Sequence, residues 1–269
     1  MQGLANQTWK WRQRVAYRLL ARSERTSWET SGGEPAPVRL DYPDHDIWLR
    51  ATSATERRWR ARACAKEPWT VRWIQEHVHR GDVFYDIGAN VGAFSLIAAV
   101  GRGATVVAFE PGYATFARLC ENIQLNACGP AIVPVPLPLS DATGLLSFTY
   151  RSLEPGQSRH ALGEKPGEAA AATPYAQPVC ATTLDRAVLD FDLPAPHHLK
   201  IDVDGSELRV LKGAKTVLQG PLLRTILIES GPDVWEALAV TLQTSGFALR
   251  MRHDRTEKRG APLYTLWTR

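Results

Sequence analysis

From Asp82 onwards, short runs of hydrophobic residues alternate with longer segments in which hydrophobic residues recur every three or four positions. Short runs are typical of buried strands, and the longer segments are typical of helices with one buried face. The pattern predicts strands at 83–87, 104–109, 132–139, 198–203 and 224–229, and helices at 93–100, 114–126, 207–218 and 234–244. Such alternation indicates a mostly parallel sheet covered by helices.

The end of the chain departs from this alternation. Two hydrophobic runs, 247–252 and 263–267, are joined by a charged turn and not by a helix. Strands joined in this way form a hairpin, so one of them must run antiparallel to the others. We therefore predict an α/β fold with a mostly parallel, Rossmann-like sheet of seven strands that includes one antiparallel strand of a C-terminal hairpin.

Two segments lie outside this pattern. Residues 1–66 contain an expected amphipathic helix at 9–21 and a stretch rich in Trp and Arg, which we interpret as an N-terminal arm and extension. The main domain is then 67–269, and it opens with a helix predicted at 70–79. Residues 151–180 follow a short strand or hairpin arm, lack periodicity and are rich in Ala, Gly, Pro and charge. They predict an irregular insertion of the kind that can serve as a lid.

Composition is ordinary for a globular protein, with 44% hydrophobic and 22% charged residues. No hydrophobic run approaches the roughly 20 residues of a membrane span, and the N-terminus lacks the hydrophobic stretch of a signal peptide, so we expect a cytoplasmic protein. The four cysteines are too widely spaced to indicate a zinc site. The net charge of +4 reflects an excess of basic residues near the N-terminus. Because no nucleic-acid-binding motif accompanies them, we expect no nucleic-acid partner.

The segment 86–92 follows the first predicted strand and contains two glycines. Open α/β sheets bind ligands beyond the carboxyl ends of their strands, so this turn is a candidate binding site. Gly88 permits a tight backbone bend, and Gly92 permits close packing of the next helix. Ala89 and Asn90 lie between them, where amides can bind an anion and Asn90 can also cap the helix.

Acidic residues at the strand ends indicate which ligand the turn binds. Asp86 would repel a pyrophosphate but can accept a hydrogen bond from the ammonium of a methionine moiety. Glu110 ends the second strand, and an acid at that place can accept from both ribose hydroxyls. After the third strand, Ser140 and Asp141 either contact the adenine amine or belong to an ordinary turn. Together these residues favour S-adenosylmethionine over a dinucleotide.

The segment 200–205 carries three charged residues on a predicted central strand. Lys200, Asp202 and Asp204 should share one face because side chains alternate along a strand. Buried charges are costly unless they are paired or functional. Lys200 and Asp202 therefore either form a structural ion pair or serve catalysis, in which an acid accepts the proton of an attacking hydroxyl and Lys200 tunes that acid. We select all three as candidate catalytic residues, and Asp202 also as a cofactor contact.

Other groups offer alternatives. Glu67 can reach the cofactor or the substrate from the N-terminal side. Three histidines are alternative bases: His160, His197 and His198. Three acids offer oxygen ligands of the type that Mg²⁺ prefers: Asp202, Asp204 and Glu229. No spacing motif requires this metal, so the sequence indicates no obligatory metal site.

Several short motifs occur in a fixed order between residues 67 and 229. They are Glu-Pro at 67–68, DIGANVG at 86–92, FEP at 109–111, ENIQLN at 121–126, LSD at 139–141, TLD at 183–185, LKIDVDGSE at 199–207 and LKG at 211–213. The ordered set resembles the FkbM family of methyltransferases. The resemblance implies a class I methyltransferase fold, S-adenosylmethionine as methyl donor, and O-methylation of a sugar, a polyketide or another hydroxylated small molecule. Asp204 stands where family members usually have Glu, so the acceptor can sit differently.

Three further interpretations follow from the same residues. N-methylation or carboxylate methylation of a small molecule is an alternative reaction. A nicotinamide-dependent oxidoreductase would require GxGxxG, whereas the turn offers only Gly88 and Gly92. A non-catalytic cofactor-binding protein of the same fold is the third, since a fold alone does not establish activity. The tryptophans between residues 48 and 73 can line a pocket, pack in the core or form a homodimer contact.

Overall fold

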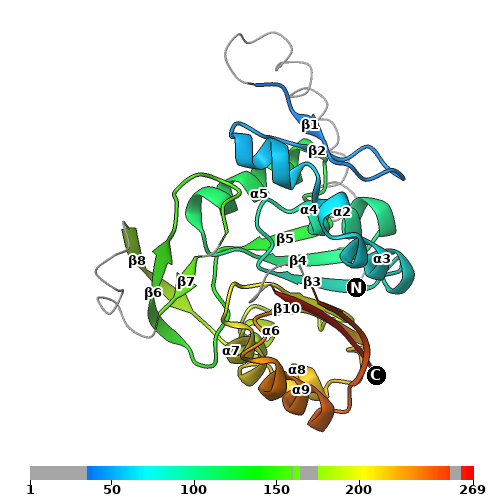
Figure 1. The fold of residues 1–269 in the computed structure, drawn as a ribbon, viewed down its shortest axis with the longest axis vertical. Coiled ribbons are helices and arrows are strands. Elements are labelled where there is room, and N and C mark those ends of the chain that lie inside the picture. The colour runs from blue at the N-terminus through cyan, green and yellow to red at the C-terminus, as the bar shows by residue number, and fades with distance from the viewer. Residues whose placement is uncertain (1–34, 159, 164–174, 255–261) are drawn as a thin grey trace, which may run out of the picture.

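The computed structural model describes residues 35–158, 160–163, 175–254 and 262–269 (Figure 1). Its centre is a seven-stranded sheet of order β11-β12-β10-β9-β3-β4-β5. The strands are β3 (Val83–Ile87), β4 (Thr105–Phe109), β5 (Ile132–Val135), β9 (His198–Ile201), β10 (Thr225–Ser230), β11 (Ala248–Asp254) and β12 (Leu263–Thr268). Neighbouring strands from β10 to β5 are parallel, and β12 runs antiparallel to both β10 and β11. The predicted parallel sheet with an antiparallel hairpin strand is confirmed.

Helices cover both faces of this sheet (Figure 1). One layer holds α3 (Pro68–His77), α4 (Ala93–Leu96) with its π-helical continuation η2 (Ile97–Gly101), and α5 (Tyr113–Leu125). The other holds α6 (Leu184–Asp190), α7 (Glu207–Lys212), α8 (Lys215–Gln219) and α9 (Trp235–Thr244). Every residue of β3 is buried, with Phe84 in the core of the first layer and Tyr85 in that of the second. The unbroken hydrophobic runs in the sequence therefore reflect strands covered on both sides.

Residues 38–66 pack onto the first helical layer. They contain β1 (Val38–Arg39), β2 (Trp48–Leu49), η1 (Glu56–Arg60) and α2 (Ala63–Lys66). Leu40, Tyr42 and Ile47 are almost fully buried in the same hydrophobic cluster as α3 and α4. The domain boundary at residue 66 stays a prediction. The helix expected at 9–21 lies outside the described residues.

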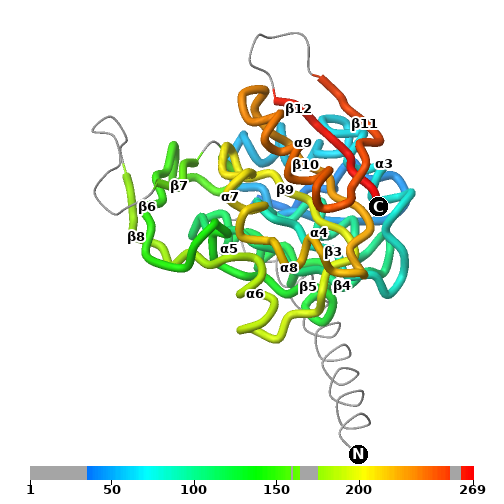
Figure 2. The backbone as a smooth tube through the Cα atoms, turned by 90° about the horizontal axis from the view of Figure 1, so that it is seen from below, coloured from blue at the N-terminus to red at the C-terminus, as the bar shows by residue number. Residues whose placement is uncertain are grey.

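A second, three-stranded antiparallel sheet of order β7-β6-β8 stands beside the central one (Figure 2). It consists of β6 (Gly144–Tyr150), β7 (Ala161–Leu162) and β8 (Tyr175–Ala181). The expectation of an irregular insertion at 151–180 is wrong for the residues in β7 and β8, although 159 and 164–174 lie outside the described part. Both strands are defined by pairing with β6, a non-local interaction that their own hydrophobic pattern does not indicate.

Two element boundaries differ from the expectation in ways that shape the site. The strand predicted to reach residue 203 ends at Ile201. The helix predicted at 207–218 is broken into α7 and α8 around Gly213, where a Cβ would lie 2.0 Å from the carbonyl oxygen of Ser140. The backbone after β5 thus approaches the backbone after α7 directly. No helix among the described residues is long and apolar enough to cross a membrane.

Candidate functional site

A cavity of two adjoining chambers opens at the carboxyl ends of the parallel strands. The large chamber is lined by the turn after β3, the ends of β4 and β10, and the segments after β5 and β9. The small chamber lies towards α4 and includes Glu67, Phe94 and Lys200. Arg60, Lys66, Gly88, Asn90 and Asp202 line both chambers. The candidate site is therefore at the sheet edge that the sequence predicted.

The glycine turn depends on both of its glycines. Gly88 has φ +82°, and a Cβ there would lie 1.8 Å from the carbonyl oxygen of Asp202. Gly92 has φ +88°, and its Cβ would lie 2.5 Å from Leu119 Cδ1. The amides of Gly88 and Ala89 both donate to the carbonyl oxygen of Phe109, at 2.9 Å each. The turn is consequently pressed between the ends of β4 and β9, where a side chain at Gly88 has no room.

Glu110 joins this turn to the end of β4. Its side chain lines the large chamber but is only 6% exposed. One carboxylate oxygen accepts from the amide of Gly112 at 2.8 Å, and the other accepts from the amide of Asn90 at 2.9 Å. Burial raises the pKa of Glu110 to about 7, against the lowering effect of these two hydrogen bonds. A carboxylate fixed in this way presents its remaining lone pairs to a ligand that carries a diol.

Asn90 uses its side chain differently from the expectation. The N-cap of α4 is Gly92, without a side-chain hydrogen bond, so the predicted Asn90 cap is wrong. The side-chain oxygen of Asn90 accepts from the amide of Val91, and its Nδ2 donates to the carbonyl oxygen of Gln157 at 2.8 Å. With φ +51° the residue projects from the turn toward the segment before β7. Asn90 therefore links the glycine turn to that segment.

Lys200 lies at the centre of a buried ionic cluster. Its Nζ is 3.0 Å from Asp202 Oδ2 and 3.5 Å from Asp86 Oδ1, and it lies 5.3 Å from the ring centroid of Phe94. Burial alone would lower the pKa of Lys200, but the charges of Asp202, Asp86 and Glu67 raise it. Burial would raise the pKa of Asp202, and Lys200 lowers it instead. The ion pair that the sequence offered as one alternative is present.

Asp86 and Asp204 lie at opposite extremes of exposure. Asp86 is fully buried, accepts from Ser95 Oγ at 2.6 Å and lines neither chamber. Its predicted contact with a ligand ammonium stays a prediction. Asp204 is exposed at φ +54° in the turn beyond β9 and lines the large chamber. The expectation that it shares a strand face with Lys200 is wrong, because the strand has ended three residues earlier.

A group of three carboxylates faces the cavity. Oxygens of Glu67, Asp202 and Glu229 lie within 4.8 Å of one another. Glu67 pairs with Lys66 at 2.8 Å. Burial raises the pKa of Glu229 to about 8, and the charges of Asp202 and Glu67 act in the same direction. The trio expected to offer ligands for Mg²⁺ contained Asp204, and in the structure Glu67 takes its place. The expectation that no metal is obligatory stays a prediction.

Ser140 and Asp141 lie beside the cavity and do not line it. Ser140 is fully buried and donates to Asp141 Oδ1 at 3.1 Å. Asp141 also pairs with Arg209 Nε at 3.0 Å. Burial would raise the pKa of Asp141, but the hydrogen bonds from Arg209 and Ser140 and the charge of Arg209 together lower it. The preceding residues Leu137 and Leu139 line the large chamber instead. The predicted adenine contact of the Ser140–Asp141 pair stays a prediction.

The three candidate histidines separate into two places. His160 lines the large chamber, with its ring 5.6 Å from that of Phe148 and 5.3 Å from that of Tyr150. Burial lowers its pKa, and the charge of Arg60 adds to this effect. His197 and His198 lie at the start of β9, at the edge of the sheet opposite the cavity. Only His160 is placed near the candidate site.

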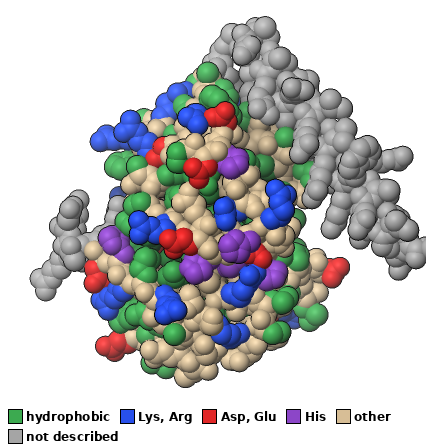
Figure 3. Space-filling view, turned by 90° about the vertical axis from the view of Figure 1, so that its right-hand side faces the viewer, with side chains coloured by type: hydrophobic (Ala, Val, Ile, Leu, Met, Phe, Trp, Pro, Cys, Tyr) green, Lys and Arg blue, Asp and Glu red, His purple; other side chains and the backbone are tan. Residues whose placement is uncertain are grey.

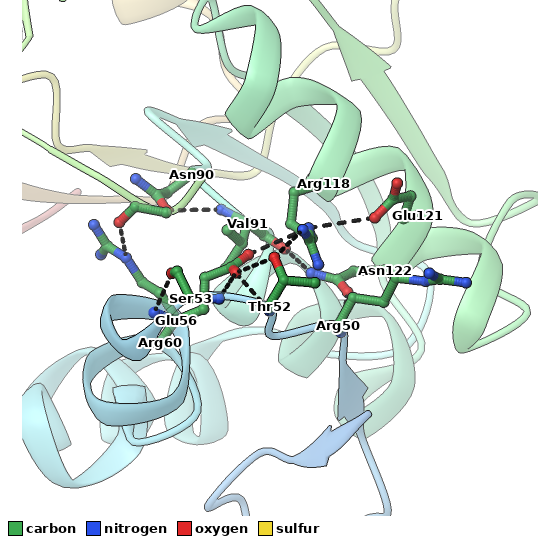
Figure 4. Close-up of polar contacts among 11 residues, drawn as sticks. Arg50, Thr52, Ser53, Glu56, Arg60, Asn90, Val91, Arg118, Glu121 and Asn122 are labelled. Atoms are coloured by element: carbon green, nitrogen blue, oxygen red, sulfur yellow. Dashed lines mark hydrogen bonds and ion pairs between the residues drawn. The ribbon is translucent and has the colours of Figure 1, made fainter. Parts of the chain in front are cut away.

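Residues that precede the glycine turn also build the site (Figure 4). Arg118 of α5 lies 3.2 Å from Glu56, whose other oxygen accepts from the amides of Thr52 and Ser53. Asn122, also on α5, accepts from the amide of Arg50 and donates to the carbonyl oxygen of Val91.

This network holds the chain before α2 against the glycine turn, and it brings Arg60 and Lys66 to the cavity. Sequence reasoning missed both cations. Their only signal was the abundance of Arg near the tryptophans, which does not indicate a position.

The lining fits a nucleoside with a charged tail. Phe109, Pro111 and Leu137 give the large chamber a nonpolar strip beside Glu110, as a base and its ribose require. Lys66 and Glu67 give the small chamber one group of each sign, as an amino acid moiety requires. The predicted cofactor residues Glu67, Gly88, Ala89, Asn90, Glu110 and Asp202 line one chamber or the other.

Comparisons with known proteins show what the chain is similar to. The Methyltransferase FkbM domain matches residues 86–247. The chain is 31% identical over 180 residues to the hexuronic acid methyltransferase AglP of Haloferax volcanii, an alignment that covers 67% of this chain and 70% of AglP. A crystal structure of methyltransferase FkbM from Methylobacillus flagellatus KT is similar with a TM-score of 0.48 and 17% identity, over 69% of this chain and 43% of that one. The chain thus spans less than half of that protein.

Proposed function

Because the chain belongs to the FkbM family of methyltransferases, we propose that it transfers the methyl group of S-adenosylmethionine to a hydroxyl oxygen of a sugar acid. One observation carries this proposal: a buried carboxylate, Glu110, lies in the same cavity as the Lys200–Asp202 pair. The first group suits the ribose of the donor, and we assign the second to the place where the acceptor oxygen meets the methyl group.

The residues around the glycine turn hold the donor. Glu110 accepts from the ribose hydroxyls, with the nonpolar strip around Phe109 and Leu137 beside the adenine. Glu67 accepts a hydrogen bond from the methionine ammonium in the small chamber. Asp86 does not line the cavity, and its carboxylate holds Lys200 in position. The bound donor supplies an electrophilic methyl group on a positively charged sulfur.

Residues after β9 and at the end of β10 serve the acceptor. A hydroxyl attacks as its proton is accepted, and the most effective base has a pKa near the working pH. The pKa of Asp202 is lowered by Lys200, whereas burial and neighbouring acids raise that of Glu229 to about 8. We therefore assign proton acceptance to Glu229 or Asp204, and to Lys200 and Asp202 the positioning of the acceptor oxygen. Alignment of oxygen and methyl supplies much of the rate.

The name of the relative AglP directs the choice of acceptor, since it is a hexuronic acid methyltransferase. A hexuronic acid offers hydroxyls, which need a base, and a carboxylate, which does not. The acidic group at the cavity favours a hydroxyl. The presence of Arg60 and Lys66 in the lining favours a second candidate reaction, formation of a methyl ester.

Transfer of a labelled methyl group separates these reactions. The protein is incubated with labelled S-adenosylmethionine and hexuronic acid glycosides, and the product is treated with mild alkali. We expect label in the sugar that survives alkali, as an ether does; label released by alkali identifies the ester. Donor binding without transfer to any sugar acid, neutral sugar or other hydroxylated compound would contradict the proposal and favour a non-catalytic binding protein.

Three finer points belong to the same proposal. We place the protein in the cytoplasm, which cell fractionation tests. We expect activity to persist after treatment with EDTA, because no observation requires Mg²⁺; loss of activity and its return with added Mg²⁺ would contradict this. A homodimer is tested by analytical ultracentrifugation.

A further inference from the structure

We infer that Arg60, supported by Lys66, forms an anion-binding subsite that selects acceptors carrying a carboxylate. The inference rests on the proposed function and adds to it a specificity-determining residue. Both cations come from the chain before residue 67, outside the matched family domain at 86–247. The acceptor class is thus chosen by a segment that the methyltransferase domain itself does not contain.

The position of Arg60 is fixed by its surroundings. It ends η1, whose first residue Glu56 is held by Arg118 at 3.2 Å (Figure 4). Arg60 Nε donates to the carbonyl oxygen of Gly156 at 2.7 Å. Gly156 is itself so close that a Cβ on it would lie 3.4 Å from Arg60 Cγ. The side chain is therefore clamped between η1 and the segment before β7.

The terminal nitrogens of Arg60 are available to a ligand. In the part of the chain that the structure describes, the guanidinium of Arg60 makes one hydrogen bond, from Nε to the carbonyl oxygen of Gly156. Arg60 lines both chambers and is half-buried. Arg60 shares the lining of the large chamber with both Glu110 and Asp202.

Lys66 has a supporting part. It also lines both chambers, but its Nζ already lies 2.8 Å from Glu67 Oε1. Because Glu67 shares that charge, Lys66 contributes less to an incoming anion than Arg60 does. A planar guanidinium also matches a carboxylate with two parallel hydrogen bonds, which an ammonium cannot do.

The acids of the cavity make the place of an anionic acceptor specific. A carboxylate elsewhere in the lining would meet acids such as Asp202 and Glu229, whereas at Arg60 it meets a guanidinium. A hexuronate can place its carboxylate on that guanidinium, and a neutral sugar offers it no charged partner. A hydrogen bond to a charged group of this kind changes affinity by about 10- to 100-fold.

Arg60→Gln tests the inference, with Arg62→Gln as matched control, since Arg62 is exposed and lines neither chamber. The acceptors are a hexuronic acid glycoside and the neutral hexoside with the same aglycone. We expect Arg60→Gln to raise KM for the glycuronide by about 10- to 100-fold and to change the hexoside by less than about 3-fold. Arg62→Gln should behave as wild type. Calorimetry with S-adenosylhomocysteine-loaded protein measures acceptor binding without turnover.

Three results would overturn the subsite. Wild-type protein that methylates hexoside and glycuronide equally well lacks the selectivity. An equal loss on both acceptors assigns Arg60 a general structural part. A matching rise in the Kd of S-adenosylmethionine assigns Arg60 to the carboxylate of the donor. In each case sugar methylation remains, so the failure is distinct from failure of the proposed function, in which wild type methylates neither sugar.

Discussion

Charged residues lie at both ends of the parallel strands β3, β4, β9 and β10. The acids at the amino ends are paired within the protein, and those at the carboxyl ends are paired only in part. At the amino ends, Asp82 lies 3.1 Å from His198 Nε2 and also pairs with Arg224. Burial would raise the pKa of Asp82, but hydrogen bonds from the His79 amide, Arg224 and His198 lower it to about 2. This acid is fully compensated by the protein.

At the carboxyl ends the acids exceed their partners. Burial raises the pKa of Glu110 to about 7 and that of Glu229 to about 8. Lys200 compensates Asp86 and Asp202, and the remaining carboxylates face the cavity. Asp82 is thus stabilised as an anion by its neighbours, whereas in the proposed function the acids with raised pKa values are stabilised as anions only when the positively charged donor binds.

The surface at the amino-end side agrees with this contrast. Figure 3 shows that side, on which His and basic side chains lie close to acidic ones without a broad patch of one sign. Charges there are balanced locally. We therefore expect substitutions at the amino ends to change stability and substitutions at the carboxyl ends to change binding.

The largest expected effect is that of Gly88→Ala. Its Cβ would meet the carbonyl oxygen of Asp202, so the turn must shift, and overpacking of up to about 3 kcal/mol should weaken S-adenosylmethionine binding by about 100-fold in calorimetry. Gly81→Ala is the matched control, because Gly81 also has positive φ but nothing within 4 Å of its Cβ. The control should lose about 1–2 kcal/mol of stability and keep full binding. Equal binding by both variants would contradict the role of the turn.

Asp82→Asn should lower the free energy of unfolding by about 1–2 kcal/mol at pH 7, because it removes the charge that pairs with Arg224, an arginine that is itself 45% exposed. The pKa of Asp82 is lowered in the folded state, so its stabilising effect is present above the unfolded pKa and is lost as pH falls toward about 2. Urea unfolding at pH 7 and pH 3 measures this. A variant that unfolds like wild type at pH 7 would show that the amino-end cluster adds nothing to stability.

The affinity for S-adenosylmethionine should depend on pH through Glu110. In the proposed function the ribose is bound by the carboxylate of Glu110, whose pKa burial raises to about 7, so Kd should rise by about tenfold per pH unit below that value. Glu110→Gln should weaken binding at pH 8 and abolish this dependence, whereas Glu229→Gln should retain it. A Kd for wild type that is constant from pH 5 to 8 would exclude Glu110 as the ribose ligand.

The smallest effect, and one of opposite sign to that of Asp82→Asn, is expected for Glu229→Gln in the ligand-free protein. Because the pKa of Glu229 is raised to about 8, the folded state loses stability as the pH rises from the ordinary pKa of a glutamate toward 8. The variant should gain about 1 kcal/mol at pH 8 and almost nothing at pH 5. Destabilisation at pH 8 would instead make Glu229 a structural acid.

The sequence predicts features that neighbouring residues determine. β3 was found in full because each of its residues is buried and four of its five residues are hydrophobic. The glycine turn follows it directly, so the bend at Gly88 needed no long-range information.

Features that depend on distant parts of the chain were not predictable in this way. Asp204 leaves the strand face because β9 stops at Ile201, and Ser140 is turned away where the backbone meets Gly213. The position of Arg60 depends on two contacts between distant residues, the Glu56–Arg118 ion pair and its own hydrogen bond to Gly156. The pattern of neighbouring residues in the sequence does not indicate contacts between distant segments.

Proton release on donor binding tests the central contrast most directly. Calorimetry at pH 7 in two buffers of different ionisation enthalpy counts the protons released by S-adenosylmethionine and by S-adenosylhomocysteine, which lacks the sulfonium charge. We predict release of about 0.5–1 proton with the first and clearly less with the second, because a cation lowers the raised pKa values of the cavity acids. Equal release with both ligands, or none with either, would contradict the account.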